Sequence, residues 1–298
     1  MRVTFLYVWL FLTAWFFTLG LGEKVPLEFK EIPNTTLKGH PTGAMCRPGF
    51  IATFSNRDIA WPFVLLTGEK ASAGKRIGYQ RLQAITYLHD LLLARPDLHV
   101  AQGLLTTESG IFFLLGTAGV GVQKLYLKWD NKCLYRLLFA FIYRLYKPAD
   151  FLDSSYIETN FNKETSVATY TICITRGTQE IDCPGFNHIY ARNPFATRTH
   201  VFSNPNSKAK NGVAVIKDQL CRVGRRFNEL EILERVHGPG RVPGVVNAEY
   251  GEVITTQPLE GEGRCKRRLG LSESGLPFTS IPTPQKMLET LFDLLEGI

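Results

Sequence analysis

The feature that most constrains the fold is an apolar run that ends in a single lysine. Residues Val213–Ile216 are all apolar and are followed by Lys217. Side chains alternate between the two faces of a strand, and both faces are apolar here, so the run predicts a buried strand with Lys217 at its end. A lysine in that position is costly unless a group of opposite charge neutralises it. The chain nearby has to supply an acid.

The helix predicted just after this strand offers such an acid. Counting about 100° per residue from Phe227, Glu229 falls inside the apolar arc of the helix, whereas Glu231 and Glu234 fall on the opposite side. The residues that define the arc are Leu230, Ile232, Leu233 and Val236. We therefore predict an ion pair between Lys217 and Glu229. The alternative is that Glu229 caps or borders the helix while the lysine extends to water.

The first half of the chain predicts an α/β domain over residues 45–150. Leucines at helical spacing predict helices at Tyr79–Ala94 and Lys132–Tyr146, and Arg95-Pro96 ends the first of them. Apolar runs bounded by glycine and proline predict strands at Phe50–Phe54, Trp61–Thr67, Val100–Thr106, Gly110–Leu115 and Gly121–Trp129. Strands interrupted by two helices predict a mixed sheet with flanking helices.

The second half, residues 151–298, predicts an α+β domain with a hinge and a following helix. Ser166–Thr175 alternates as a strand does, and Gly185–Pro194 fits a strand or a turn. Leu259–Pro284 is rich in Gly, Ser and Pro, which predicts a loop or hinge. Thr283–Gly297 predicts an amphipathic helix with Thr283 as its N-cap. The apolar face of this helix predicts a site for a protein partner.

Composition limits the classes of function. The chain has 298 residues, 45% of them hydrophobic and 20% charged, and a net charge of +7. Its densest basic run, Arg264–Arg268, lacks interleaved aromatic residues, so we predict a solvated loop and no nucleic-acid partner. The six cysteines form no Cys-x-x-Cys pair, which argues against a zinc site. A disulfide between Cys173 and Cys183 is expected only in an oxidising compartment.

The N-terminal segment, residues 1–22, resembles a secretory signal. Val3–Leu19 is apolar apart from two threonines, and Gly20 and Gly22 supply the small residues that signal peptidase needs. As a helix, the apolar run would span about 26 Å, slightly less than the hydrocarbon core of a membrane. The alternatives are a membrane anchor and a wrongly assigned first exon. The expected location is therefore secretory or membrane-bound.

Several separated blocks together resemble the fungal-type protein kinase family. The blocks are Val213–Asp218, Arg225–Leu233, Val242–Val246, Arg267–Leu269, Gly275–Ser280 and the helix ending at Gly297, with Arg47-Pro48, Trp61–Lys70 and Leu82–Trp129 upstream. The resemblance covers residues 45–298. It implies a pre-kinase region followed by a kinase small lobe, and a cytoplasmic or nuclear location in place of a secretory one.

The resemblance also implies an ATP site. In such a lobe the lysine pairs with nucleotide phosphates and with the helix glutamate, which assigns these roles to Lys217 and Glu229. Arg198 and Thr199 match the family's arginine and threonine near the phosphate-covering loop. However, Phe195–Phe202 contains no glycine, so we expect weak ATP binding at most. No metal site is expected, and ATP is the one cofactor to consider.

The catalytic motifs of a kinase are missing from these residues. No histidine opens a His-Arg-Asp loop, and Asp-Phe-Gly does not occur. Nothing therefore positions Mg²⁺ or the acceptor hydroxyl. We expect an incomplete kinase-like protein, a pseudokinase that acts by binding. The alternatives are a truncated product of an active Ser/Thr kinase that binds ATP, and a secreted or membrane-tethered scaffold.

The upstream block also suggests a relic of a nuclease. Many metal-dependent nucleases place Pro-Asp on one strand and Glu-x-Lys on the next, so that two carboxylates hold Mg²⁺. Here the first motif is Pro48-Gly49 and the second is Glu69-Lys70 without a spacer. Neighbouring side chains on a strand face opposite sides, so Glu69 and Lys70 could not serve one site. We expect the fold without the activity.

Overall fold

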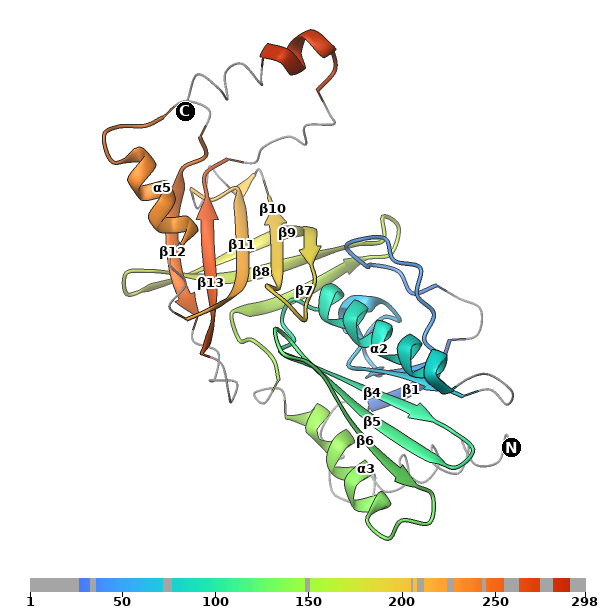
Figure 1. Cartoon of the computed structure of the whole chain (residues 1–298). Helices are drawn as coiled ribbons and strands as arrows, with labels where there is room; N and C mark the ends of the chain where they lie inside the picture. The colour runs from blue at the N-terminus through green and yellow to red at the C-terminus, as the bar shows by residue number, and fades with distance from the viewer. Residues whose placement is uncertain are drawn as a thin grey trace. The chain divides into compact units, whose positions relative to one another are not determined.

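The structure is a computed structural model. It describes residues 27–32, 36–71, 77–147, 151–204, 206–207, 212–223, 228–242, 245–254, 263–273 and 281–289. The protein has an α/β fold with two sheets and few helices in this part of the chain (Figure 1). The chain divides into two compact units. Unit 1 is Met1–Ser154, Phe161–Ala168 and Asn193–Ala196; unit 2 is Ser155–Asn160, Thr169–Arg192 and Thr197–Ile298.

Unit 1 is built on a six-stranded mixed sheet. Its strands lie in the order β1-β2-β3-β4-β5-β6, and β3 and β4 are the parallel pair among antiparallel neighbours. The strands are β1 (Leu27–Glu31), β2 (Phe50–Phe54), β3 (Leu66–Lys70), β4 (Val100–Thr106), β5 (Gly110–Thr117) and β6 (Gly121–Lys128). The parallel pair requires a crossover, which the helix α2 (Ile77–Ala94) provides.

One helix covers each face of this sheet, as Figure 1 shows for α2 and for α3 (Leu134–Tyr143). Leu88, Leu91 and Leu92 of α2 pack in one hydrophobic cluster together with Leu105 and Leu114. The apolar side of α3 packs in a second cluster together with Leu104 and Phe113. Adjacent residues such as Leu104 and Leu105 therefore serve different cores, because successive side chains point to opposite faces of a strand. The predicted helices and most of the predicted strands of this half are confirmed.

The predicted strand Trp61–Thr67 is wrong in its first part. Trp61–Phe63 forms a 3-10 helix (η1), and β3 begins only at Leu66. Pro62 explains the difference, because proline has no N–H for a sheet ladder but fits the first turn of a helix. A second 3-10 helix, η2 (Arg144–Tyr146), completes the region that we predicted as one helix up to Tyr146.

Unit 2 contains most of a seven-stranded sheet with the order β12-β13-β11-β10-β9-β8-β7. The strands are β7 (Tyr156–Asn162), β8 (Val167–Arg176), β9 (Gln179–Arg192), β10 (Thr199–Ser203), β11 (Val215–Arg222), β12 (Ala248–Ile254) and β13 (Arg264–Leu271). The helix α5 (Glu229–His237) lies in the chain between β11 and β12, and Figure 1 shows it beside β12. The segment Gly185–Pro194, predicted as a strand or a turn, is mostly strand, within β9.

Two predictions about unit 2 are wrong. Lys217 is not the last residue of its strand but the third residue of β11, which continues to Arg222. Residues Arg264–Leu271, predicted as part of a solvated loop, form β13. This strand lies between β11 and β12, and Lys266 and Arg268 are buried. The charged residues of β13 conceal the apolar pattern by which a central strand is normally predicted. A buried acid, Asp218, neutralises Lys266 and Arg268.

The last described segment is helical from Pro284 to Glu289. Thr283 caps it as predicted, because the N–H of Lys286 donates to the Thr283 hydroxyl at 3.1 Å. Met287 and Leu288 are exposed. A partner for this helix stays a prediction, and the residues predicted to continue it, 290–297, lie outside the described part.

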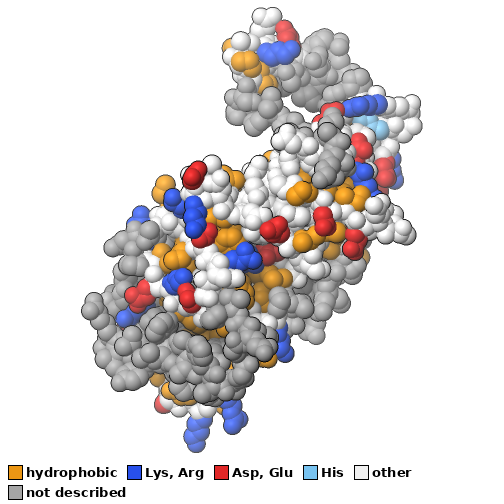
Figure 2. Space-filling model, turned by 180° about the vertical axis from the view of Figure 1, so that it is seen from behind, with side chains coloured by type: hydrophobic (Ala, Val, Ile, Leu, Met, Phe, Trp, Pro, Cys, Tyr) orange, Lys and Arg blue, Asp and Glu red, His pale blue; other side chains and the backbone are white. Residues whose placement is uncertain are grey.

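The predicted signal or anchor at residues 1–22 also lies outside the described residues. In the described part, no helix is long and apolar enough to cross a membrane. On the face drawn in Figure 2, the described acidic and basic side chains are interspersed with hydrophobic ones.

Candidate functional site

The predicted ion pair is present in unit 2. Lys217 Nζ lies 2.5 Å from Glu229 Oε2, which confirms the pairing that the sequence predicts. Lys217 comes from β11, and Glu229 is the first residue of α5. The side chains are 25% and 42% exposed, so solvent reaches both partners. The negative charge of a glutamate in the first turn also interacts favourably with the positive end of the helix dipole.

The start of α5 is fixed by a cap. The Asn228 side chain accepts a hydrogen bond from the N–H of Leu230 at 3.1 Å. The helix packs on β12 where Leu230 lies over Gly251, since a Cβ on that glycine would come within 2.3 Å of Leu230 Cδ2. Gly251 therefore lets the helix approach the sheet closely and brings Glu229 within reach of Lys217.

Our apolar arc for α5 is only partly correct. Leu233 is buried, but Ile232 and Val236 are 47% and 36% exposed. The helix begins at Glu229 and contacts the sheet through few residues, so Glu229 meets Lys217 from its first turn and not from the middle of a buried stripe. The predicted contact is right, although part of the reasoning for it is not.

A pocket of about 440 Å³ lies between α5 and the sheet. Cationic and amide groups line it, with two acids and several apolar side chains. The lining residues are Lys217, Gln219, Cys221, Asn228, Glu229, Leu230, Ile232, Gly251, Glu252, Val253, Arg267, Arg268 and Leu269. The Lys217 ammonium and the neighbouring amides can donate hydrogen bonds to an anionic or polar ligand.

The structure separates the other two predicted ligand residues. Thr199 begins β10 and is buried, and its hydroxyl accepts a bond from Gln219 Nε2 at 3.5 Å. Thr199 does not line the pocket itself, but its bonding partner Gln219 does. Arg198 is buried, and its Nε donates to His200 Nε2 at 2.7 Å. His200 lies opposite Asp218 in the register, whereas Val201 lies opposite Lys217. Arg198 therefore belongs to the opposite face of the sheet.

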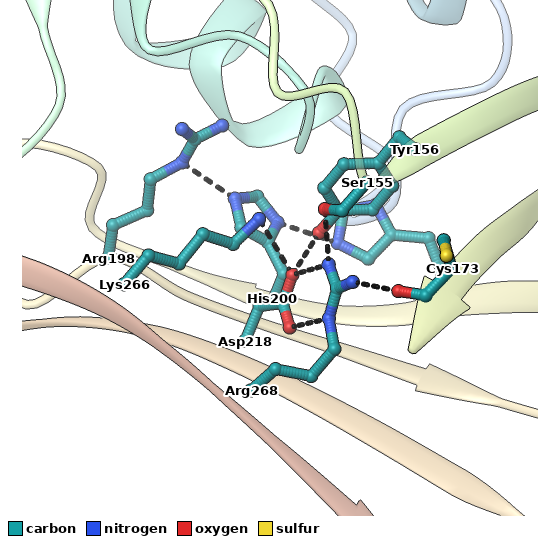
Figure 3. A network of polar contacts seen from close by, with 9 residues as sticks. Ser155, Tyr156, Cys173, Arg198, His200, Asp218, Lys266 and Arg268 are labelled. Carbon is teal, nitrogen blue, oxygen red and sulfur yellow. Dashed lines mark hydrogen bonds and ion pairs between the residues drawn. The ribbon is translucent and has the colours of Figure 1, made fainter. Parts of the chain in front are cut away.

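That opposite face carries a buried network centred on Asp218 (Figure 3). Arg268 grips both carboxylate oxygens, with Nε to Oδ1 at 2.7 Å and Nη2 to Oδ2 at 2.6 Å. Lys266 Nζ lies 2.8 Å from Oδ2, and the Tyr156 hydroxyl also donates to that oxygen. The two cations hold the pKa of the Asp218 carboxyl far below its usual range, although burial alone would raise it.

The remaining donors of Arg268 reach the start of β7 and the strand β8. Nη1 donates to the Cys173 carbonyl at 2.6 Å, and Nη2 donates to the Ser155 hydroxyl at 3.0 Å. The Tyr156 ring stacks under both cations, with Lys266 Nζ 4.3 Å from its centroid. One guanidinium thus joins β13, β11 and β8 inside unit 2. Its burial is tolerated because hydrogen bonds satisfy it in the plane and an aromatic ring covers it.

The tautomer of His200 follows from its partners. Arg198 Nε can only donate, so His200 Nε2 accepts and Nδ1 carries the proton, which it donates to His188 Nε2 at 2.9 Å. Burial, together with the positive charges of Arg198 and Lys266, lowers the pKa of His200 well below 6.5. The imidazole is therefore neutral at physiological pH.

We did not predict this network from the sequence. One available signal was the spacing of Lys266 and Arg268, which are two residues apart and so face the same side of a strand. Another was Asp218, next to Lys217 in the sequence and therefore on the other face. We gave more weight to the charged composition of Arg264–Arg268, which is typical of a loop, and therefore predicted a loop in place of a strand.

Unit 1 places the residues of the suggested nuclease motifs near one another, while the nuclease relic itself stays a prediction. A Cβ on Gly49 would lie 3.3 Å from Glu69 Oε1, so position 49 stands beside that carboxylate. Glu69 Oε2 accepts from Gln83 of α2 at 3.4 Å. Position 49, Glu69 and Gln83 of α2 therefore lie close together, and position 49 carries no carboxylate. Lys70 is exposed.

Neither metal nor disulfide chemistry is apparent in the described residues. No group of three or more His, Cys, Asp or Glu is placed there to hold a metal ion. All six cysteines are free. Cys173 lies opposite Asp182 and Cys183 opposite Ile172, so the two thiols face different sides and the suggested disulfide is wrong. Burial and Asp90 raise the pKa of Cys46 to about 12, which keeps its thiol protonated.

No family model matches the chain, and no curated protein or solved structure matches it.

Proposed function

We propose that unit 2 is a protein-kinase-like small lobe of the fungal-type family, which binds a nucleotide weakly without transferring phosphate. The observation that carries the proposal is the 2.5 Å contact between Lys217 on a strand and Glu229 on the next helix. In protein kinases such a pair organises the lysine toward the α- and β-phosphates of ATP.

The order of the elements supports the same proposal. In protein kinases the lysine lies on the third strand of the small lobe and the glutamate on the helix that follows. Here β9, β10 and β11 pair successively as antiparallel strands, Lys217 lies on the third of these, and α5 follows. Two later strands, β13 and β12, continue the sheet beside β11, and β8 and β7 extend it beyond β9.

The pocket beside Lys217 fits a weak phosphate site. Lys217 supplies the cation, and Gln219 and Asn228 supply amides. The segment Asn193–Arg198, which precedes β10, contains no glycine. Side chains on such a segment keep backbone amides away from phosphates, which favours low affinity.

The proposal is limited to binding. A kinase needs an aspartate that orients the acceptor hydroxyl, and an asparagine and a second aspartate that hold Mg²⁺. These residues belong to the His-Arg-Asp and Asp-Phe-Gly motifs, which the 298 residues do not contain.

A thermal-shift titration with Mg-ATP tests this proposal. We expect stabilisation only at millimolar nucleotide, because a weak site has a high Kd. A ligand at 100 times its Kd adds about 2.7 kcal/mol to the stability of the folded state. The shift should disappear in Lys217→Met and shrink in Glu229→Gln.

The matched control is Lys286→Met, which removes another lysine paired with a glutamate, at 3.1 Å and outside the pocket. This variant should keep the nucleotide response. An equal response in Lys217→Met would refute the kinase-like site, and a Lys217-dependent shift at micromolar nucleotide would refute the weak affinity.

A further inference from the structure

Two thiols face each other on neighbouring strands, and one of them, Cys221, lines the pocket. Cys221 of β11 lies directly opposite Cys265 of β13 in the antiparallel register. Their Sγ atoms are 3.8 Å apart. Opposed residues of antiparallel strands have Cα separations of about 4.5 or 5.5 Å, and both values lie within the range that a disulfide spans. A bond between the two sulfurs therefore requires side-chain rotation but no rearrangement of the strands.

The surroundings give the two thiols different roles. Cys221 is buried at 3% exposure, whereas Cys265 is partly exposed near the start of β13. Arg267 lies two residues beyond Cys265 on the same face of β13, which places its positive charge near both sulfurs. The thiolate is the reactive form of cysteine, and burial raises the pKa of the Cys221 thiol. The accessible thiol is thus Cys265, and Cys221 is placed behind it.

We propose that Cys221 and Cys265 form a reversible oxidation site, in which a low-molecular-weight disulfide converts the two thiols into a cross-strand disulfide. This inference concerns a wall of the same pocket but does not rest on nucleotide binding.

The reaction takes place in two exchange steps. The Cys265 thiolate attacks one sulfur of the small disulfide, forms a mixed disulfide and releases one small thiolate, which takes up a proton. The Cys221 thiol then loses its proton and attacks the Cys265 sulfur, which releases the second small thiol. The two cysteines are oxidised by two electrons in total, and the small disulfide is reduced to two thiols.

The new bond closes a loop that contains α5 and β12. These two elements lie between Cys221 and Cys265 in the chain and carry Glu229, Gly251 and Glu252 of the pocket. A crosslink at the base of a loop restricts the unfolded chain more than the folded one. Oxidation is therefore expected to raise the melting temperature of the full chain, and a reducing thiol should reverse the rise.

The other cysteines provide an internal comparison. Cys173 and Cys183 are also on neighbouring strands, but adjacent register positions put them on opposite faces of the sheet. Cys133 is exposed and lies in unit 1. Intramolecular crosslinking should therefore be confined to Cys221 and Cys265.

The test is peptide mapping of the full chain after treatment with oxidised glutathione. Trypsin cuts after Lys217, Arg222, Arg264 and Lys266, so the disulfide appears as Asp218–Arg222 joined to Cys265-Lys266. We expect this linked peptide to form and to disappear after reduction. Alkylation of both cysteines should fall by about tenfold or more in the oxidised sample.

Single substitutions separate the two steps. Cys221→Ser removes the resolving thiol and should leave a stable glutathione adduct on Cys265. Cys265→Ser should leave Cys221 reduced, and Cys133→Ser should form the linked peptide as the wild type does. If these variants do not fold, the wild-type map still decides the matter. Unchanged alkylation of both cysteines, or an adduct on Cys265 without the linked peptide in the wild type, would overturn the proposal.

Discussion

Asp218 is the residue on which the buried charges of unit 2 depend. Its carboxylate is 1% exposed and meets Arg268, Lys266 and the Tyr156 hydroxyl. A buried ion pair is weak evidence of net stabilisation, because desolvation offsets the attraction between the charges. Removal of one partner is different, since it leaves the other charges buried without compensation.

We therefore expect Asp218→Asn to lower the free energy of unfolding by about 3–5 kcal/mol. Urea denaturation, followed by hydrogen exchange of β11 and β13, measures the loss. Asp182→Asn on β9 is the control, because Asp182 is exposed and its substitution should change stability by less than about 0.5 kcal/mol. Equal losses in the two variants would contradict the central role of Asp218.

His200 predicts a dependence of stability on pH. Its folded-state pKa is lowered well below 6.5, so the unfolded chain takes up the proton first as the pH falls. Its contribution to stability is complete above pH 6.5 and is lost as the pH decreases below that value, with a slope of up to about 1.4 kcal/mol per pH unit. Asp218, whose pKa is also lowered, adds a further loss below its ordinary value of 3.8.

The variant His200→Gln isolates the histidine. We expect a lower stability at pH 7.5, because the bonds to Arg198 and His188 change, but a smaller further loss between pH 6.5 and pH 5 than in the wild type. Urea midpoints across this range provide the measurement. If the two proteins show parallel pH profiles, the titrating group is a different one.

Some of these residue-level contacts could be predicted and others could not. Lys217 and Glu229 are 12 positions apart, and local periodicity was enough to pair them. Asp218 and Arg268 are 50 positions apart, and their contact depends on β13 lying between β11 and β12. Sequence spacing gives the face of a strand but not its neighbours in a sheet. The pocket residues were therefore partly predicted, and the network was not.

At the scale of elements, both sheets use the same packing device. An aromatic ring on one strand lies over a glycine directly opposite on its neighbour, as Phe50 does over Gly68 and Tyr250 over Gly270. A Cβ on Gly68 would come within 1.9 Å of the Phe50 ring, and one on Gly270 within 2.0 Å of the Tyr250 ring. Glycine lowers strand propensity, but here it makes room for a ring that fixes the register.

Gly68→Ala and Gly270→Ala should each reduce stability by about 1–3 kcal/mol, because the added methyl group displaces a packed ring. Gly78→Ala is the matched control. It lies in α2 with open space around its Cβ position, and alanine there should stabilise the helix by about 0.5–1 kcal/mol. Thermal unfolding of the three variants gives the order, and a neutral result at Gly68 and Gly270 would contradict the packing argument.

The elements themselves were predictable where one pattern dominated. Helical spacing of leucines predicted α2, and glycine-bounded apolar runs predicted β4, β5 and β6. Prediction failed at η1, where the apolar composition of Trp61–Thr67 hid the effect of Pro62, and at β13, where buried charges resemble a solvated loop. At η1 composition competed with a local backbone constraint, and at β13 it competed with pairing to strands that are distant in the sequence.

At the scale of the molecule, the chain has two units and each buries its own apolar side chains. Unit 1 contains both large hydrophobic clusters. In unit 2, Tyr170, Phe186, Phe202 and Ile216 are almost completely buried. A unit with its own core can unfold separately from its neighbour in the chain, so a single unfolding free energy need not describe the whole protein.

The positions of the tryptophans make this testable. Trp9 and Trp15 lie outside the described residues, whereas Trp61 and Trp129 belong to unit 1, so the fluorescence of these two reports on unit 1. Hydrogen exchange of β11 and β13 peptides reports on unit 2. We expect Gly68→Ala to lower the urea midpoint seen by fluorescence and to leave the exchange of β11 and β13 unchanged.

Gly270→Ala should do the reverse, because Gly270 and Tyr250 belong to unit 2. The pair of variants is matched, since each adds one methyl group beneath an aromatic ring in one sheet. If both variants shift both probes equally, the two cores unfold as one cooperative transition, and the separation is refuted. If each variant shifts only its own probe, the stability of the unit that holds Lys217 and Glu229 can be measured independently of unit 1.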